Sequence, residues 1–176
     1  MSILPTVKTE IKSQDPKNLI LFGLPKVGKT TALAELPNCL IVDLENGSQY
    51  VSGFTVKAST YIDLYKIAKA LKEEDHNFKF VVLDTVTALE EIALDLQGKI
   101  SNILSAKSDA IAYLYRDSEN GNLMANFGDM NSVLTGARMP HLAGKTILLA
   151  ERIQDDDQNW KIKTYWENIY PSLKHE

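Results

Sequence analysis

The chain has a single cysteine, Cys39, and only three arginines among its 176 residues. A lone cysteine excludes an intramolecular disulfide and argues against a thiolate zinc site. No apolar run reaches the roughly 18 residues of a candidate membrane span, and the first residues lack the apolar stretch of a secretory signal. The formal net charge of −4 argues against a surface that attracts phosphate backbones over its whole area. These absences favour a cytoplasmic domain with no membrane partner.

The composition is that of an ordinary globular protein. Hydrophobic residues make up 44% and charged residues 24%, which excludes a disordered chain. The length suits one domain. Residues 1–17 are predicted to be an N-terminal lead-in or edge strand, because apolar and charged side chains alternate over 7–12. Residues 18–176 are predicted to form the single folded domain.

Short apolar runs alternate with amphipathic segments along the chain. The runs at 18–22, 39–42, 80–83 and 146–150 are typical of buried strands, and 160–162 and 164–166 resemble the arms of a late strand or hairpin. Helices are expected at 29–36, 60–74, 85–97, 101–115 and 123–138. The helix at 60–74 follows a Ser59 or Thr60 cap and has an apolar side that includes Ile62 and Tyr65. This alternation predicts an α/β domain with a largely parallel central sheet flanked by helices.

The strongest motif is the segment GLPKVGKTT at 23–31, which matches the phosphate-binding pattern G-x-x-x-x-G-K-[ST]. Glycines let the backbone approach phosphate oxygens closely, and the loop amides direct positive partial charge at the anion. In this pattern Lys29 reaches the outer phosphates and the Thr30 hydroxyl is a magnesium ligand. The predicted nucleotide contacts are Gly23, Leu24, Pro25, Lys26, Val27, Gly28, Lys29, Thr30 and Thr31. No N-K-x-D guanine motif occurs, which favours ATP over GTP.

Two carboxylates follow predicted strands. Asp84 ends the run at 80–83, where an aspartate beside a phosphate loop can hold Mg²⁺ directly or through water. Glu45 stands two residues after Asp43, where a glutamate can orient and polarise an attacking water. Spacing alone leaves open that Glu45 is a solvated turn carboxylate. The residue after Asp84 is Thr85, so the catalytic glutamate that directly follows this aspartate in many ATPases is absent.

Taken together, GKTT at 28–31, IVDLENG at 41–47 and VVLDT at 81–85 resemble the RecA-like recombinase core. They resemble more closely the short phage-encoded ATP-binding proteins of that superfamily, which include single-strand annealing proteins. The resemblance spans about residues 18–151 and implies a RecA-like P-loop NTPase fold with a mostly parallel central sheet. It implies that Glu45 and Lys29 are catalytic, and that Thr30 and Asp84 hold Mg²⁺ beside ATP.

The same resemblance implies a function and partners. The expected activity is hydrolysis of ATP to ADP and phosphate, weak or stimulated by DNA, in phage DNA recombination or single-strand annealing. The expected partners are single-stranded DNA, further copies of the chain in a homo-oligomer or filament, and other recombination or replication proteins. If the protein is phage-encoded, its location is the host cytoplasm.

The chain departs from that family after the run at 146–150. Members often carry a Gln or His sensor there, whereas this chain has Glu151 and Arg152. The charges do not by themselves predict DNA binding, because residues 98–122 carry three charges of each sign and Arg152 stands among four acids over 151–157. Candidate aromatic residues for base stacking are Tyr113, Tyr115 and Trp160, although such aromatics more often belong to a core or a hairpin.

Three points stay open. The residue acting in trans on a neighbouring subunit's ATP would be Arg116, Arg138, Arg152 or a lysine, with no basis for choosing. A small P-loop kinase is an alternative that the scarcity of arginine disfavours. A non-catalytic, nucleotide-gated binding module is a second alternative, which the unusual Glu151 and Arg152 motivate.

Overall fold

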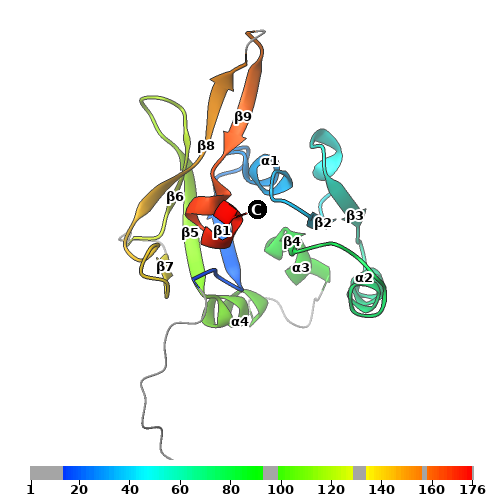
Figure 1. The fold of residues 1–176 in the computed structure, drawn as a ribbon. Helices are drawn as coiled ribbons and strands as arrows, with labels where there is room; N and C mark the ends of the chain where they lie inside the picture. Colours follow the sequence, from blue (N-terminus) through cyan, green and yellow to red (C-terminus); the bar gives the residue numbers. More distant parts are fainter. Residues whose placement is uncertain (1–13, 93–98, 129–133, 156–157, 176) are drawn as a thin grey trace, which may run out of the picture.

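The computed structural model describes residues 14–92, 99–128, 134–155 and 158–175, and the strands of these segments form two sheets (Figure 1). One sheet has the order β3-β2-β4, with both pairs parallel. The other has the order β1-β5-β6-β8-β9, and a short strand, β7, also pairs with β5. The strands are β1 (Leu19–Gly23), β2 (Cys39–Asp43), β3 (Phe54–Lys57), β4 (Phe80–Asp84), β5 (Ala110–Arg116), β6 (Leu123–Asn126), β7 (Gly136–Ala137), β8 (Thr146–Gln154) and β9 (Trp160–Thr164).

The prediction of one largely parallel central sheet is wrong in part. Parallel pairing occurs in β3-β2-β4 and between β1 and β5, whereas the other described pairs of the larger sheet are antiparallel. Short connections join β5 to β6 and β8 to β9, and a short connection permits only an antiparallel pair. The α/β character of the domain is confirmed.

Four α-helices occur among the described residues: α1 (Lys29–Ala34), α2 (Tyr61–Glu73), α3 (Val86–Ile92) and α4 (Lys99–Lys107). Short 3₁₀ segments are η1 (Ser48–Tyr50), η3 (Trp166–Asn168) and η4 (Pro171–His175). No helix of the described segments is long and apolar enough to cross a membrane. The predicted edge strand at 7–12, and the part of the predicted 85–97 helix after residue 92, lie outside the described residues.

Helix α2 begins where its capping residues predict. The Thr60 hydroxyl accepts a hydrogen bond from the Asp63 backbone N–H at 3.2 Å, and the Asp63 carboxylate accepts one from the Thr60 N–H at 3.0 Å. This reciprocal capping box satisfies two helix N-terminal donors. The apolar side of the helix is only partly covered. No residue of α2 is buried, and Ile62 and Tyr65 remain 62% and 61% exposed, while Leu64, Ile67 and Leu71 are half-buried. Figure 1 shows the reason, because α2 lies at the rim of the molecule beyond the smaller sheet.

The helix predicted at 101–115 is confirmed only over 101–107. The helix predicted at 123–138 is wrong where the structure describes it, and residues 129–133 lie outside the described part. Residues 101–115 form the end of α4 and then strand β5, and residues 123–126 form strand β6. Along β5 the buried residues are Ala110, Ala112 and Leu114, and the residues between them lie half-buried on the other face. Apolar side chains therefore occupy both faces, which hides the two-residue period of a strand. The late hairpin also differs from its prediction, because its arms are β8 and β9 and Trp166 begins η3.

The core joins the two sheets through the C-terminal segment. Trp166 is buried and its indole N–H donates a hydrogen bond of 2.8 Å to the Ala32 carbonyl on α1. The Tyr170 ring packs edge-on against Phe80 of β4, with 4.9 Å between ring centroids. Because α1 follows β1 and β4 belongs to the smaller sheet, these contacts set the position of one sheet relative to the other.

Candidate nucleotide-binding site

Residues 24–28 form a loop between β1, which ends at Gly23, and α1. A Cβ atom on Gly23 would lie 2.4 Å from the Leu114 carbonyl oxygen of the adjacent strand, so no larger residue fits there. Gly28 has a φ of 108° and caps the N-terminus of α1. A residue with a side chain rarely adopts that angle, which explains the second glycine of the motif. Both glycines therefore meet a geometric requirement of the loop.

Lys29 turns back over this loop. Its Nζ donates hydrogen bonds to the carbonyl oxygens of Gly23 at 2.9 Å and Leu24 at 3.1 Å. The ammonium group consequently lies within the turn of the loop, where its charge favours an anion. The structure thus places the motif lysine at the loop that the sequence predicts to hold phosphates.

The hydroxyl of Thr30 and the carboxylate of Asp84 meet at the carboxyl ends of β1 and β4. Thr30 Oγ1 donates a hydrogen bond of 2.7 Å to Asp84 Oδ2, across 54 residues of sequence. Hydroxyl and carboxylate oxygens are the ligand types that Mg²⁺ prefers. The two residues predicted to hold the metal are therefore brought together, and their chemistry fits that ion.

Asp43 organises the turn that carries Glu45. Its buried carboxylate accepts hydrogen bonds from the backbone N–H groups of Glu45, Gly47 and Ser48 at 3.1, 3.2 and 2.9 Å, and from the Ser48 hydroxyl at 2.5 Å. Burial raises the pKa of Asp43, but these hydrogen bonds outweigh it and the net shift is downward. Asp43 is thus a charged acceptor at the centre of the turn.

Glu45 contacts the residue that follows Asp84. The Thr85 hydroxyl donates a hydrogen bond of 2.5 Å to Glu45 Oε1. Asp43 and Asp84 are directly opposite each other in the pairing of β2 with β4, so the segments that follow both strands lie at the same edge. Glu45 therefore lies at that edge with a defined partner, although its side chain is exposed.

Arg116 is a site residue that the sequence did not place. Its Nε donates a hydrogen bond to the Val27 carbonyl at 3.0 Å, and its Nη1 donates one to the Gly121 carbonyl at 2.9 Å. Placing Arg116 at the loop requires the pairing of β5 with β1, in which Gly23 lies opposite Leu114. The sequence predicts a helix over 101–115, and a helix there leaves no strand to pair with β1.

Other candidate residues lie away from the loop in this subunit. Glu151 and Arg152 belong to β8, which β5 and β6 separate from β1. Glu151 accepts a hydrogen bond from the Tyr165 hydroxyl. Arg138 lies at the opposite end of β5 from Arg116, 3.6 Å from Asp109.

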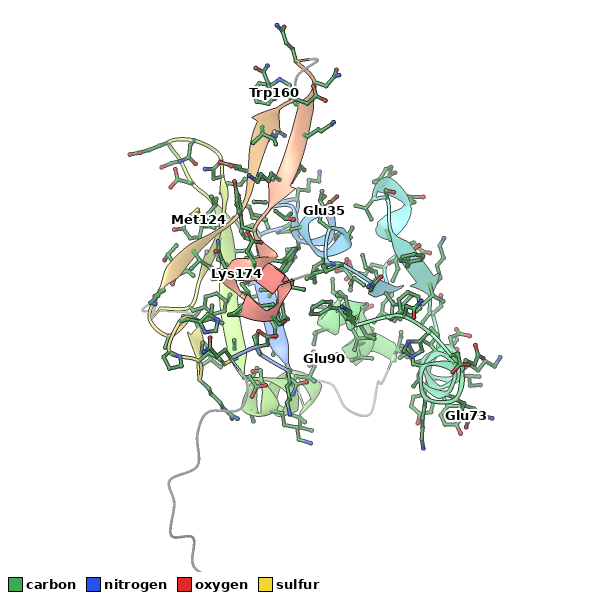
Figure 2. The ribbon with its side chains drawn as sticks, viewed as in Figure 1. Glu35, Glu73, Glu90, Met124, Trp160 and Lys174 are labelled. Atoms are coloured by element: carbon green, nitrogen blue, oxygen red, sulfur yellow. The ribbon has the colours of Figure 1, made fainter. Side chains whose placement is uncertain are left out.

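The candidate stacking aromatics fall into two groups. The Tyr113 ring packs against Phe22 and Tyr115, with centroids 5.4 and 6.1 Å apart, and is half-buried. Trp160 is 68% exposed, near the end of the β8–β9 hairpin (Figure 2). Of these three candidates, only Trp160 presents most of its surface to solvent.

Comparison with known proteins identifies one related family. A family model described as an AAA domain matches residues 15–124. No curated protein and no solved structure matches the chain. The matched segment runs from before β1 to β6 and includes the loop at 24–28, Glu45, Asp84 and Arg116.

Proposed function

The chain belongs to the AAA-domain family of P-loop ATPases, and on that premise we propose that it binds ATP with Mg²⁺ and hydrolyses it to ADP and phosphate. The hydrogen bond between Thr30 and Asp84 is the observation that carries this proposal. It joins the motif at 23–31, which contains Thr30, to the aspartate that ends β4, and the two residues are 54 positions apart in the sequence. Water attacks the terminal phosphorus, the bond to the bridging oxygen breaks, and ADP leaves with that oxygen.

Each site residue has a proposed role. Lys29 offsets negative charge on the phosphates, and the loop amides hold them. Thr30 and Asp84 would hold Mg²⁺, which when bound supplies further positive charge beside the phosphates. Glu45 orients the attacking water and accepts its proton. The hydrogen bond from Thr85 supports this role, because it holds the carboxylate at the edge of the sheet where Asp84 lies.

Three variants test the proposal. We expect Lys29→Ala to lose ATP binding, and Glu45→Gln to bind ATP while losing most of its turnover. Glu73→Gln is a matched control, since Glu73 lies on α2 and pairs with Lys69. Equal turnover by Glu45→Gln and the wild type would overturn the role of Glu45. Binding without turnover by the wild type would favour the non-catalytic module, and phosphate transfer to a nucleoside monophosphate would favour the kinase.

As a finer proposal, ATP turnover serves DNA recombination or single-strand annealing, with single-stranded DNA as the ligand. One face of the β8–β9 hairpin supports it. Arg152 lies opposite Ile162 and Gln154 opposite Trp160, so these four side chains, none of them acidic, share a face of the paired strands. Trp160 and Ile162 on this face are 68% and 40% exposed. An exposed indole beside a guanidinium is suited to stack on bases near a phosphate backbone.

Two acidic groups of the same hairpin have partners within it or directly after it. Asp155 pairs with Lys161 at 2.9 Å, and Glu151 accepts a hydrogen bond from Tyr165. The Asp155 pair also uses the positive charge of Lys161, so the support for DNA binding comes from the face with Arg152 and Trp160. Figure 1 shows the hairpin extending beyond the body of the domain, where a strand of DNA can reach it.

Binding to a fluorescent oligothymidine at low salt tests the DNA proposal. We expect Trp160→Ala to weaken binding, and Trp160→Phe, which keeps an aromatic ring, to retain most of it. ATP turnover should rise when the oligonucleotide is added. If the wild type does not bind DNA and its turnover is unchanged, the recombination role fails while the ATPase proposal stands.

A homo-oligomer or filament is the further part of the proposal, together with contacts to other recombination or replication proteins in the cytoplasm. The exposed Tyr61, Ile62 and Tyr65 on α2 support a contact between copies of the chain. Native mass with and without ATP tests it. We expect Ile62→Asp to reduce the assembled fraction, and a wild type that is monomeric in both conditions would refute it.

A further inference from the structure

We propose that Arg116 is a positioning residue of the nucleotide site, which holds the phosphate-binding loop in shape from the end of β5. The inference rests on the proposed nucleotide binding. It assigns Arg116 a role within its own subunit, through the loop backbone. The same guanidinium also donates a hydrogen bond to the turn at 117–122, so Arg116 links this turn to the loop.

The position of Arg116 follows from the pairing of β5 with β1. Gly23, where the loop begins, lies opposite Leu114 in the parallel register. Arg116 is two residues further along and so projects from the same face of the strand as Leu114. Strand β5 thus ends with a long cationic side chain beside the loop, and its guanidinium reaches the Val27 carbonyl at 3.0 Å.

This hydrogen bond sets the direction of the next amide. The peptide unit between Val27 and Gly28 is trans and planar, so its C=O and N–H point in opposite directions. Holding the Val27 oxygen toward Arg116 therefore directs the Gly28 N–H away from it. Within the described residues, that N–H has no hydrogen-bond acceptor. It is available to an anion held by the loop.

Gly28 also allows the guanidinium to lie close. A Cβ atom at Gly28 would be 2.8 Å from Arg116 Nη2, so the end of the arginine side chain would have to shift. The glycine thus meets two requirements, since its φ of 108° also disfavours a side chain. A side chain at this residue would therefore strain the loop backbone and displace the guanidinium from its present position.

The second hydrogen bond ties the loop to the turn between β5 and β6. Arg116 Nη1 donates to the Gly121 carbonyl at 2.9 Å. The turn is closed by backbone hydrogen bonds from Asp117 to Asn122 at 2.8 Å and from Gly121 to Asp117 at 2.9 Å. A guanidinium presents its donors in a rigid planar fork. Movement of the Val27 carbonyl or of the Gly121 carbonyl therefore shifts the group that holds the other one. Lysine carries the charge without this fork.

Nucleotide titration of Arg116→Ala and Arg116→Lys tests the inference. We expect both variants to raise the Kd by about tenfold, the effect of losing one or two hydrogen bonds to a charged donor. The Kd values for ATP and ADP should rise by the same factor, because the loop holds phosphates that both carry. The KM for ATP should rise with kcat retained. Arg138→Lys is the matched control, since Arg138 lies at the far end of β5, and it should bind as the wild type does.

Several outcomes would overturn the inference. Wild-type affinity in Arg116→Lys would show that charge alone suffices, and a larger loss for ATP than for ADP would show direct contact with the terminal phosphate. Unchanged affinity in Arg116→Ala would refute it outright. Because Arg116 is exposed, both variants should melt near the wild-type temperature. If the alanine variant does not fold, the affinity of Arg116→Lys decides the test. A wild type that binds no nucleotide refutes the proposed function instead.

Discussion

The hydroxyl of Thr85 donates a hydrogen bond of 2.5 Å to the carboxylate of Glu45, across 40 residues of sequence. Thr85 directly follows Asp84, whose carboxylate accepts a hydrogen bond from Thr30 on α1. The carboxylates of Glu45, which follows β2, and of Asp84, which ends β4, thus lie with the Thr30 hydroxyl of α1 at the carboxyl ends of these parallel strands. Five predictions follow from contacts at or near this edge and from the core beneath it.

Removing the Thr85 hydroxyl is expected to slow ATP turnover. Thr85→Val keeps the shape of the side chain but leaves Glu45 without its donor, so we expect kcat to fall by about tenfold with ATP affinity unchanged. Thr85→Ser should retain most of the activity. Thr87→Val is the control, since Thr87 is an exposed residue of α3. Steady-state turnover measures the effect, and an unchanged kcat in Thr85→Val would refute it.

Asp84→Asn is expected to weaken the Mg²⁺ binding that the site is proposed to have. The amide keeps a hydrogen-bonding oxygen but loses the negative charge that attracts the cation. We expect the Mg²⁺ concentration for half-maximal turnover to rise about tenfold or more. Asp75→Asn, at an exposed position, should leave the Mg²⁺ titration unchanged.

Asp43 is expected to make stability depend on pH. Its pKa is lowered in the folded protein, so its contribution is complete above the unfolded pKa, about 3.9, and is lost as pH falls through the folded value. Asp43→Asn should lower the free energy of unfolding by about 2 kcal/mol at neutral pH. Urea unfolding between about pH 7 and pH 2 should show the two proteins converging at the acid end. A constant difference would contradict the assignment.

Cys39 is expected to resist modification in the folded protein. Burial raises its thiol pKa to about 11, so little thiolate exists near neutral pH, and the side chain is only 4% exposed. A thiol reagent at about pH 8 should react slowly with the native protein and quickly once urea unfolds it. Fast labelling under native conditions would show that β2 opens readily.

Trp166 is expected to stabilise the contact between the C-terminal segment and α1. Trp166→Phe removes the indole donor to the Ala32 carbonyl and should lower the free energy of unfolding by about 1–2 kcal/mol. Trp166→Ala should cost about 3–5 kcal/mol because it also leaves a cavity. Trp160→Phe is the control, since the exposed Trp160 should change stability by less than about 0.5 kcal/mol. Urea unfolding measures all three.

Segments whose structure depends on nearby residues were predictable. The positions of β1, β2, β4 and α1 agree with their apolar runs and motif, and the Thr60 cap begins α2 as expected. Strands β5 and β6 were not predictable from periodicity. Ala110, Ala112 and Leu114 are buried while the residues between them are apolar and half-buried, so no contrast marks the strand.

The sequence by itself predicted the loop that we propose to bind phosphates, because Gly23, Gly28, Lys29 and Thr30 lie within one short stretch and their spacing is the signal. Tertiary structure alone decided which distant groups meet that loop. Arg116 contacts the Val27 carbonyl across 89 residues, through a strand pairing that no local pattern encodes. The exposure of α2 was likewise decided by packing, since an apolar stripe is buried only where another element covers it.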